Sequence, residues 1–122
     1  MEKDIRSYKD LKIWQRGISL VKEIYKETQN FPRQELYGLT NQIRRAAVSI
    51  PSNIAEGHTR QHRAEFRQFL SMALGSLTEL ETQILISSEL NYISLEACEN
   101  LTQKMDSLGK MTRGLIKKLT NP

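Results

Sequence analysis

Residues 44–57 constrain the fold most, because their hydrophobic positions keep a helical spacing through a proline. In the segment RRAAVSIPSNIAEG, Ala47, Ile50 and Ile54 recur in steps of three and four, with Pro51 among them. Proline lacks the N–H that would donate to the carbonyl four residues earlier, and its ring crowds that carbonyl. Since the stripe stays in phase on both sides of Pro51, the pattern predicts one kinked helix; the alternative is two helices that break at Ile50.

Helical spacing recurs along the rest of the 122 residues, and no block of alternating β-branched residues indicates a strand. We predict helices over about residues 8–29, 33–56, 62–89 and 95–119. Because their connections are short, neighbouring helices should be antiparallel. The sequence therefore predicts an all-α, up-down-up-down four-helix bundle with a proline-kinked second helix. It forms one domain over residues 1–122, in which residues 1–8 are an N-terminal arm.

The hydrophobic stripes predict which residues enter the core. In the first two helices they are Leu11, Trp14, Ile18, Val21, Tyr25, Leu36, Leu39, Ile43, Ala46, Ala47, Ile50 and Ile54. In the last two they are Phe66, Leu70, Ala73, Leu77, Leu80, Ile84, Cys98, Leu101, Met105, Leu108, Leu115 and Leu119. We expect the single cysteine to act as a small buried hydrophobic residue, Gly57 to end the second helix in a left-handed conformation, and Ser94 to cap the fourth.

The connection between the second and third helices carries the densest basic cluster that includes a helix start. Arg60, Arg63 and Arg67 lie there, and guanidinium groups bind phosphate bidentately beside a helix N-terminus that attracts anions. The net charge of +4 permits a nucleic-acid partner without requiring one. We therefore predict that these three arginines contact RNA or DNA, with Arg44 and Arg45 as second choices; the alternative is an ordinary solvated loop.

A polar face on the second helix suggests a different role. This face carries Arg45, Ser49, Ser52 and Glu56 at helical spacing, with Asn53 next to them. Its partners on the third helix, at the same kind of spacing, are Glu79 and Gln83. We interpret this set as a structural polar network that fixes helix register or a subunit interface. A ligand site or a nucleic-acid site is the alternative, and catalysis is a more distant one.

No complete constellation for catalysis, metal binding or a cofactor is visible. The glycines are scattered singly rather than in a phosphate-binding loop, and there is no nucleophile elbow or Cys/His pair. His58 and His62 are four residues apart but straddle a predicted helix start, with Glu65 as the only convenient third ligand. We expect no enzyme activity, no metal and no cofactor. Without an N-terminal or membrane-length hydrophobic run, we expect a cytoplasmic protein with no membrane partner.

The order of several motifs resembles one known family. They are Asp10-Leu11, Ile13-Trp14-Gln15, Leu36-Tyr37-Gly38-Leu39-Thr40, Gln42-Ile43-Arg44-Arg45-Ala46-Ala47, Ser49-Ile50-Pro51, Asn53-Ile54-Ala55-Glu56-Gly57, Phe66, Phe69-Leu70, Ala73-Leu74-Gly75-Ser76-Leu77 and Glu79-Leu80-Glu81-Thr82-Gln83. From Tyr8 to Leu119 the chain resembles the 23S rRNA-intervening-sequence proteins, also called S23 ribosomal proteins or four-helix bundle proteins. One departure is His62, where the family often has a Ser or Thr that would form a capping box with Glu65.

The resemblance implies a kinked four-helix bundle that assembles as a homopentamer and associates with ribosomal RNA. It also implies kinship with the accessory protein of diversity-generating retroelements, which binds a reverse transcriptase and nucleic acid. Two function hypotheses follow. The first is a homo-oligomeric, non-enzymatic module that binds RNA or DNA through a basic surface; the second is a scaffold that binds another protein and touches nucleic acid only weakly.

Overall fold

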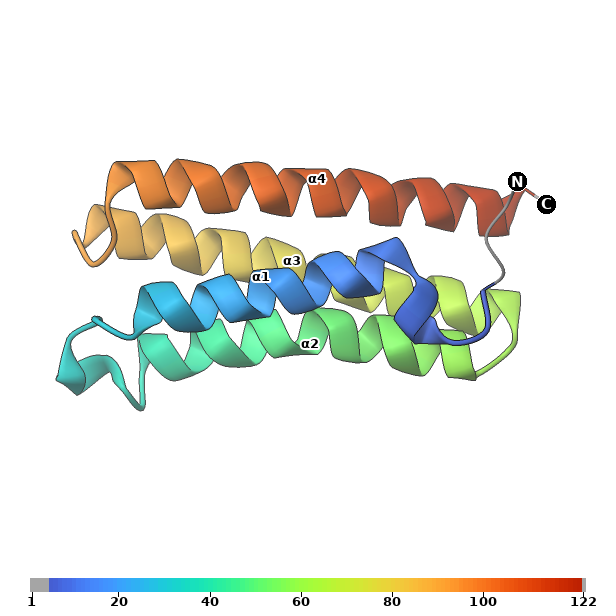
Figure 1. Ribbon diagram of the computed structural model, residues 1–122, viewed down its shortest axis with the longest axis horizontal. Coiled ribbons are helices and arrows are strands. Elements are labelled where there is room, and N and C mark those ends of the chain that lie inside the picture. The colour runs from blue at the N-terminus through green and yellow to red at the C-terminus, as the bar shows by residue number, and fades with distance from the viewer. Residues whose placement is uncertain (1–4, 122) are drawn as a thin grey trace.

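Four long helices run alternately up and down along one axis in the computed structural model, which describes residues 5–121 (Figure 1). Their bounds are α1 Lys12–Thr28, α2 Leu39–Thr59, α3 Arg63–Glu89 and α4 Leu95–Thr120, with 3-10 turns η1 at Tyr8–Asp10 and η2 at Arg33–Glu35. The predicted all-α four-helix bundle is confirmed. The predicted N-terminal arm falls partly on residues 1–4, which lie outside the described residues.

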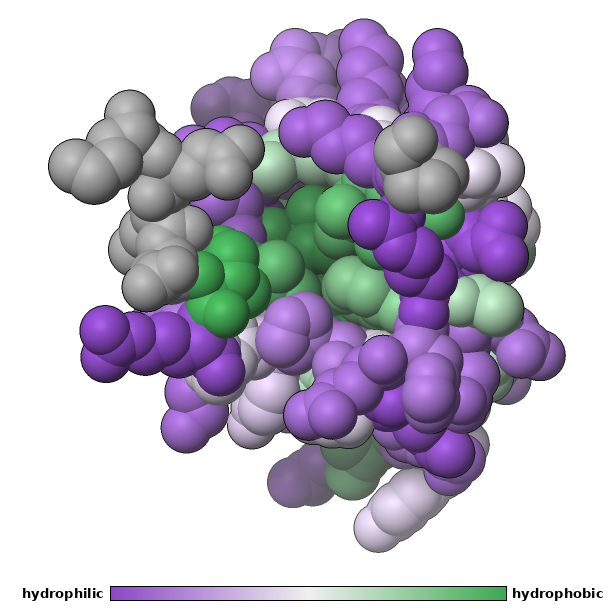
Figure 2. Space-filling model, turned by 90° about the vertical axis from the view of Figure 1, so that its right-hand side faces the viewer, coloured by the Kyte–Doolittle hydropathy of each residue, from purple (hydrophilic) through white to green (hydrophobic). Residues whose placement is uncertain are grey.

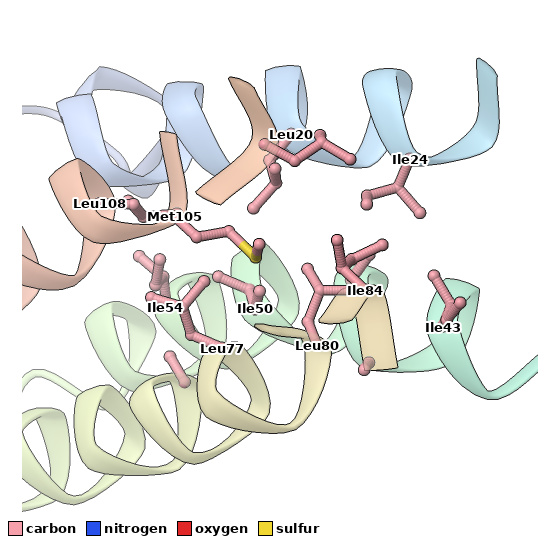
Figure 3. Close-up of a cluster of buried hydrophobic side chains, with 14 of the residues drawn as sticks. Leu20, Ile24, Ile43, Ile50, Ile54, Leu77, Leu80, Ile84, Met105 and Leu108 are labelled. Carbon is pink, nitrogen blue, oxygen red and sulfur yellow. The ribbon is translucent and has the colours of Figure 1, made fainter. Parts of the chain in front are cut away.

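The core is a column of aliphatic side chains contributed by all four helices. Figure 3 shows Leu20 and Ile24 of α1 above Ile50 of α2 and Leu80 of α3, with Met105 of α4 reaching between them. Leu80 and Ile24 are fully buried, and Ile50 and Met105 are 1% exposed. Five of the six residues in the predicted seam of the third helix are buried, from Leu70 to Ile84. The four-and-three spacing thus identified the inner face of α3 correctly.

The predicted inner face of the first helix was only partly right, because Leu11, Trp14 and Val21 pack against the core but are not its most buried residues. The buried line of α1 is Ile13, Gly17, Leu20, Ile24 and Thr28, while the predicted stripe lies beside it and Tyr25 is 42% exposed. The physical reason is that two of the buried residues are not hydrophobic. A Cβ on Gly17 would lie 3.3 Å from Cβ of Pro51, so α1 packs closely on α2 at this glycine. Thr28 satisfies its buried hydroxyl by donating to the Ile24 carbonyl at 2.7 Å.

The first and second helices begin later in the chain than the sequence predicted. Residues 8–10 form the separate turn η1, which Ser7 and Asp10 close with a capping box, and the chain is extended at Leu11 before α1 begins. Residues 33–35 form η2, and Gly38 has φ −113° and ψ −113°, which no helix accommodates. The second helix therefore begins at Leu39. Leu36, expected in the core, is 45% exposed.

Pro51 lies inside an uninterrupted helix. α2 runs through it from Leu39 to Thr59, which confirms one helix and excludes the break at Ile50. The proline is itself buried and faces Gly17 of α1. A bend of the helix axis at this point stays a prediction.

Gly57 does not end α2, contrary to the prediction. The helix continues for two more residues, and no glycine among the described residues has a positive φ. The left-handed residue of this connection is Gln61, with φ 62°. Gly57 is instead buried where α3 crosses α2, and a Cβ there would lie 2.6 Å from Cβ of Phe69. This position is glycine because it permits close helix packing, not because it reverses the chain.

The turn between α3 and α4 contacts the connection between α1 and α2 through a hydrogen bond and a pair of aromatic rings. The Tyr92 hydroxyl donates to the Glu35 carboxylate at 2.9 Å, and the Tyr92 ring lies 5.4 Å from the ring of Phe31. The hydrogen bond raises the pKa of Tyr92, and burial and the Glu35 charge act in the same direction. Ser94 then caps α4 by accepting from the Ala97 N–H at 3.1 Å, as predicted.

The raised pKa of Tyr92 predicts a pH-dependent contribution to stability. Because the folded pKa exceeds the unfolded one, this contribution is complete below the ordinary tyrosine pKa and is lost as the pH rises through the folded pKa. We expect Tyr92→Phe to lower the melting temperature at neutral pH, and the difference from the parent to shrink in strongly alkaline buffer. Thermal unfolding of both proteins across that range is the measurement. A difference that stays constant into alkaline pH would contradict this account.

Candidate nucleic-acid interface

The predicted basic cluster lies at the end of the bundle where α2 passes into α3. Arg60 pairs with Glu56 at 3.0 Å and with Glu65 at 3.7 Å, and its guanidinium carbon lies 5.2 Å from the ring centroid of Phe69. The two carboxylates offset the charge of Arg60 locally. Because all three charged side chains are roughly half exposed, water and salt screen these pairs.

The other two arginines of the cluster differ in their surroundings. Arg63 donates to the carbonyl of Leu119 at 3.5 Å, close to the C-terminus of α4. Arg67 is half-buried, and its buried Nε lacks a hydrogen-bond partner among the described residues. His62 precedes α3 without a capping bond from its side chain, as its difference from the family pattern suggested. The three arginines thus lie at one end of the bundle, where Arg60 and Arg63 bind groups of the protein itself.

This end of the molecule is not uniformly charged. Figure 2 looks onto it and shows hydrophilic residues around a hollow with hydrophobic residues at its centre. A groove of about 380 Å³ opens here between the start of α1 and the end of α4, with Leu11, Ile13, Met111 and Leu115 in its lining. Phosphate groups would therefore meet cations at the rim and hydrophobic surface in the middle.

A second arginine-bearing surface lies along the outer side of α2. It is a shallow groove of about 720 Å³ that we call the tyrosine–arginine groove. Its lining comprises Tyr25, Leu36, Tyr37, Asn41, Arg44, Arg45, Val48, Ser49 and Ser52, with no acidic residue among them. Tyr37 is 90% exposed. The groove combines two cations, two aromatic rings and several small polar groups on one face.

Arg44 is held in place at the wall of this groove. Its Nε donates to the Thr28 hydroxyl at 2.9 Å, and its guanidinium carbon lies 4.6 Å from the ring centroid of Tyr25. Thr28 is fixed in turn by its own bond to the Ile24 carbonyl. Anchoring one edge and one face of the guanidinium reduces the entropy that it loses when the terminal nitrogens bind an anion. Arg45, the next residue, is exposed.

The predicted structural polar network is dispersed within this chain. Ser49, Ser52 and Asn53 donate to backbone carbonyls of α2 itself, at 2.8 Å in each case. Arg45 and Glu79 are exposed, and Glu56 pairs with Arg60. Gln83 is 6% exposed, and its Oε1 has no hydrogen-bond partner within residues 5–121. The structure thus does not join these side chains into one network inside the chain; their predicted role at a subunit interface stays a prediction.

The remaining candidate chemistry is accounted for by packing. His58 makes an edge-to-face contact with Phe66, with ring centroids 5.6 Å apart. In the described part of the chain, no group of three His, Cys, Asp or Glu residues could hold a metal ion. Cys98 is buried with a free thiol. None of the helices formed by the described residues is both long and apolar enough to cross a bilayer.

Comparison with known proteins identifies the family. The family model described as 23S rRNA-intervening sequence protein matches residues 9–114. The chain belongs to this family. A search of curated proteins found no match. The chain is similar to a solved structure from Bacteroides thetaiotaomicron, a protein of unknown function from the S23 ribosomal protein family. The two are 27% identical with a TM-score of 0.77, over 86% of this chain and 98% of the other.

The sequence identified the arginines of both surfaces but gave no indication that Tyr25 and Tyr37 lie beside Arg44 and Arg45. Tyr25 was assigned to the core because it continued a hydrophobic stripe, and Tyr37 was noted only as part of a family motif. The available signal was the placement of Tyr37 just before Gly38, in a connection where no helical face could bury its ring.

Proposed function

We propose that this protein is a non-enzymatic, cytoplasmic binding module that associates with RNA through its arginine-bearing surfaces. The observation that supports this most is the tyrosine–arginine groove, in which Arg44 and Arg45 lie beside exposed aromatic rings with no acidic residue in the lining. Phosphates supply most of the affinity in nucleic-acid binding, and they need cations that are free to pair. Within the described residues, no carboxylate pairs with Arg45 or with the terminal nitrogens of Arg44, so these groups are free to bind phosphate.

We further propose that the module acts as a homo-oligomer, for which family resemblance suggests five copies. Self-association would repeat each groove around the assembly and multiply a modest net charge of +4 into an extended field. Exposed aliphatic side chains support the existence of a protein contact. Leu85, Ile86, Leu90 and Leu95 are 43–74% exposed near one end of the bundle.

A scaffold that binds another protein is the second candidate, and the same aliphatic residues favour it. A purification test distinguishes the two candidates. Protein that carries nucleic acid at low salt, seen in the ratio of absorbance at 260 and 280 nm, and loses it at high salt supports the RNA-binding module. A clean oligomer without nucleic acid at either salt supports the scaffold.

Two double variants test which arginines bind. Each removes two positive charges: Arg44→Gln with Arg45→Gln, and Arg60→Gln with Arg63→Gln. We expect both to reduce retention of RNA, the first pair more strongly, because Arg60 is paired with two carboxylates and the lining around Arg44 and Arg45 has none. Retention is measured by filter binding at low salt. Equal retention by the parent and the first variant would exclude the groove as an RNA site, and equal retention by the second would exclude the end cluster.

A further inference from the structure

The tyrosine–arginine groove differs from the other surfaces in what it offers a nucleic acid. The end cluster supplies arginines beside carboxylates, whereas the groove places cations beside aromatic faces. Rings of tyrosine stack on bases, and guanidinium groups pair with phosphates or stack on bases themselves. The combination therefore suits a nucleotide with an accessible base, and not only a phosphate backbone.

The two tyrosines of the groove have separate roles. The Arg44 guanidinium already lies against the ring of Tyr25, which helps to hold that arginine in place. Tyr37 has no such partner among residues 5–121, and with 90% of its surface exposed it presents its ring to solvent. A large aromatic ring in that position gains little from its own fold. It gains stacking energy when a base covers it.

We propose that the groove binds single-stranded RNA, with an unpaired base stacked on Tyr37 and the adjoining phosphates held by Arg44 and Arg45. This inference rests on the proposed RNA-binding function and specifies its ligand and its site. In an A-form duplex the bases are paired and stacked on one another, so their faces are not available to a side chain.

Charge favours RNA over a protein occupant of the groove. Its lining contains two arginines and no carboxylate, and its only aliphatic members are Leu36 and Val48. Other exposed aliphatic side chains, Leu85, Ile86, Leu90 and Leu95, lie outside the groove. Asn41, in the lining of the groove, adds a side-chain amide that can bond to a base edge or a sugar.

The test compares binding of a fluorescent 12-nucleotide RNA, single-stranded or annealed to its complement, by anisotropy at low salt. We expect the native chain to bind the single strand at least several-fold more tightly than the duplex. Tyr37→Ala should weaken single-strand binding about fivefold or more and leave duplex binding unchanged, since stacking on one ring is lost. Tyr37→Phe, which keeps the ring, should bind as the parent does.

Three outcomes would overturn the inference. Equal affinity for single strand and duplex, with no effect of Tyr37→Ala, would leave RNA binding intact and remove only the groove as a single-strand site. Light scattering that shows a changed oligomeric state for Tyr37→Ala would make the groove an interface between copies. Absence of binding to either RNA at low salt would overturn the proposed function as well.

Discussion

Leu80→Ala should lower the free energy of unfolding by about 2–5 kcal/mol, the largest effect that we expect from one substitution in this chain. Leu80 is completely buried on α3, and Figure 3 shows it among side chains from the other helices. Truncation removes hydrophobic contacts and leaves a cavity that the surrounding helices fill only in part. Chemical denaturation followed by circular dichroism, at one fixed protein concentration, gives the difference.

Met72→Ala is the matched control for this prediction. It truncates a side chain of similar size on the same helix where 49% of the residue is exposed, and methionine and alanine have similar helix propensities. We expect a change of at most about 0.5 kcal/mol. Similar losses at both positions would mean that the core does not lie where the structure places it.

Gly57→Ala should destabilise the protein by about 1–3 kcal/mol, although alanine has a higher helix propensity than glycine. The added Cβ would lie 2.6 Å from Cβ of Phe69 and 3.1 Å from Cδ1 of Phe66. The Cβ of Phe69 is attached directly to the backbone of α3, so relief of the contact requires the two helices to separate. The melting temperature should fall by several degrees.

Gly75→Ala provides the opposite expectation from the same substitution. Gly75 is exposed on α3, and nothing lies within 4 Å of the position where its Cβ would be. Alanine there should raise stability by about 0.5–1 kcal/mol, because it restricts the unfolded chain and favours helix. If Gly57→Ala also raised the melting temperature, the close approach of α2 and α3 at Gly57 would be wrong.

Hydrophobic spacing predicted much of the fold because α2, α3 and α4 bury mostly aliphatic residues at regular intervals. The continuity of α2 through Pro51 followed from the phase of the stripe alone. Hydrophobic spacing does not identify buried positions that small or polar residues occupy, and Gly17 and Thr28 of α1 are two of these. The predicted role of Gly57 at the helix end was wrong for a related reason. A glycine needed for close packing has the same local sequence signature as one needed for a turn.

The candidate site was less predictable than the core. Arg44 and Arg45 were second choices in the sequence, and the structure distinguishes their surroundings from those of Arg60. Thr28 and Tyr25 hold Arg44 from another helix, whereas Glu56 and Glu65 pair with Arg60. A linear charge pattern ranks the loop first because its cations are denser. The Glu56–Arg60 pair is a local i,i+4 pair that the sequence could have shown, whereas the contacts of Arg44 with Thr28 and Tyr25 appear only once the helices are arranged.

A salt titration of the native chain with single-stranded RNA tests the central claim most directly. The measurement is the association constant, from fluorescence anisotropy, at a series of salt concentrations. The account predicts that the logarithm of this constant falls linearly with the logarithm of salt, with a slope of about −0.7 for each phosphate that an arginine neutralises. Absence of binding at low salt, or an affinity that does not change with salt, would contradict it.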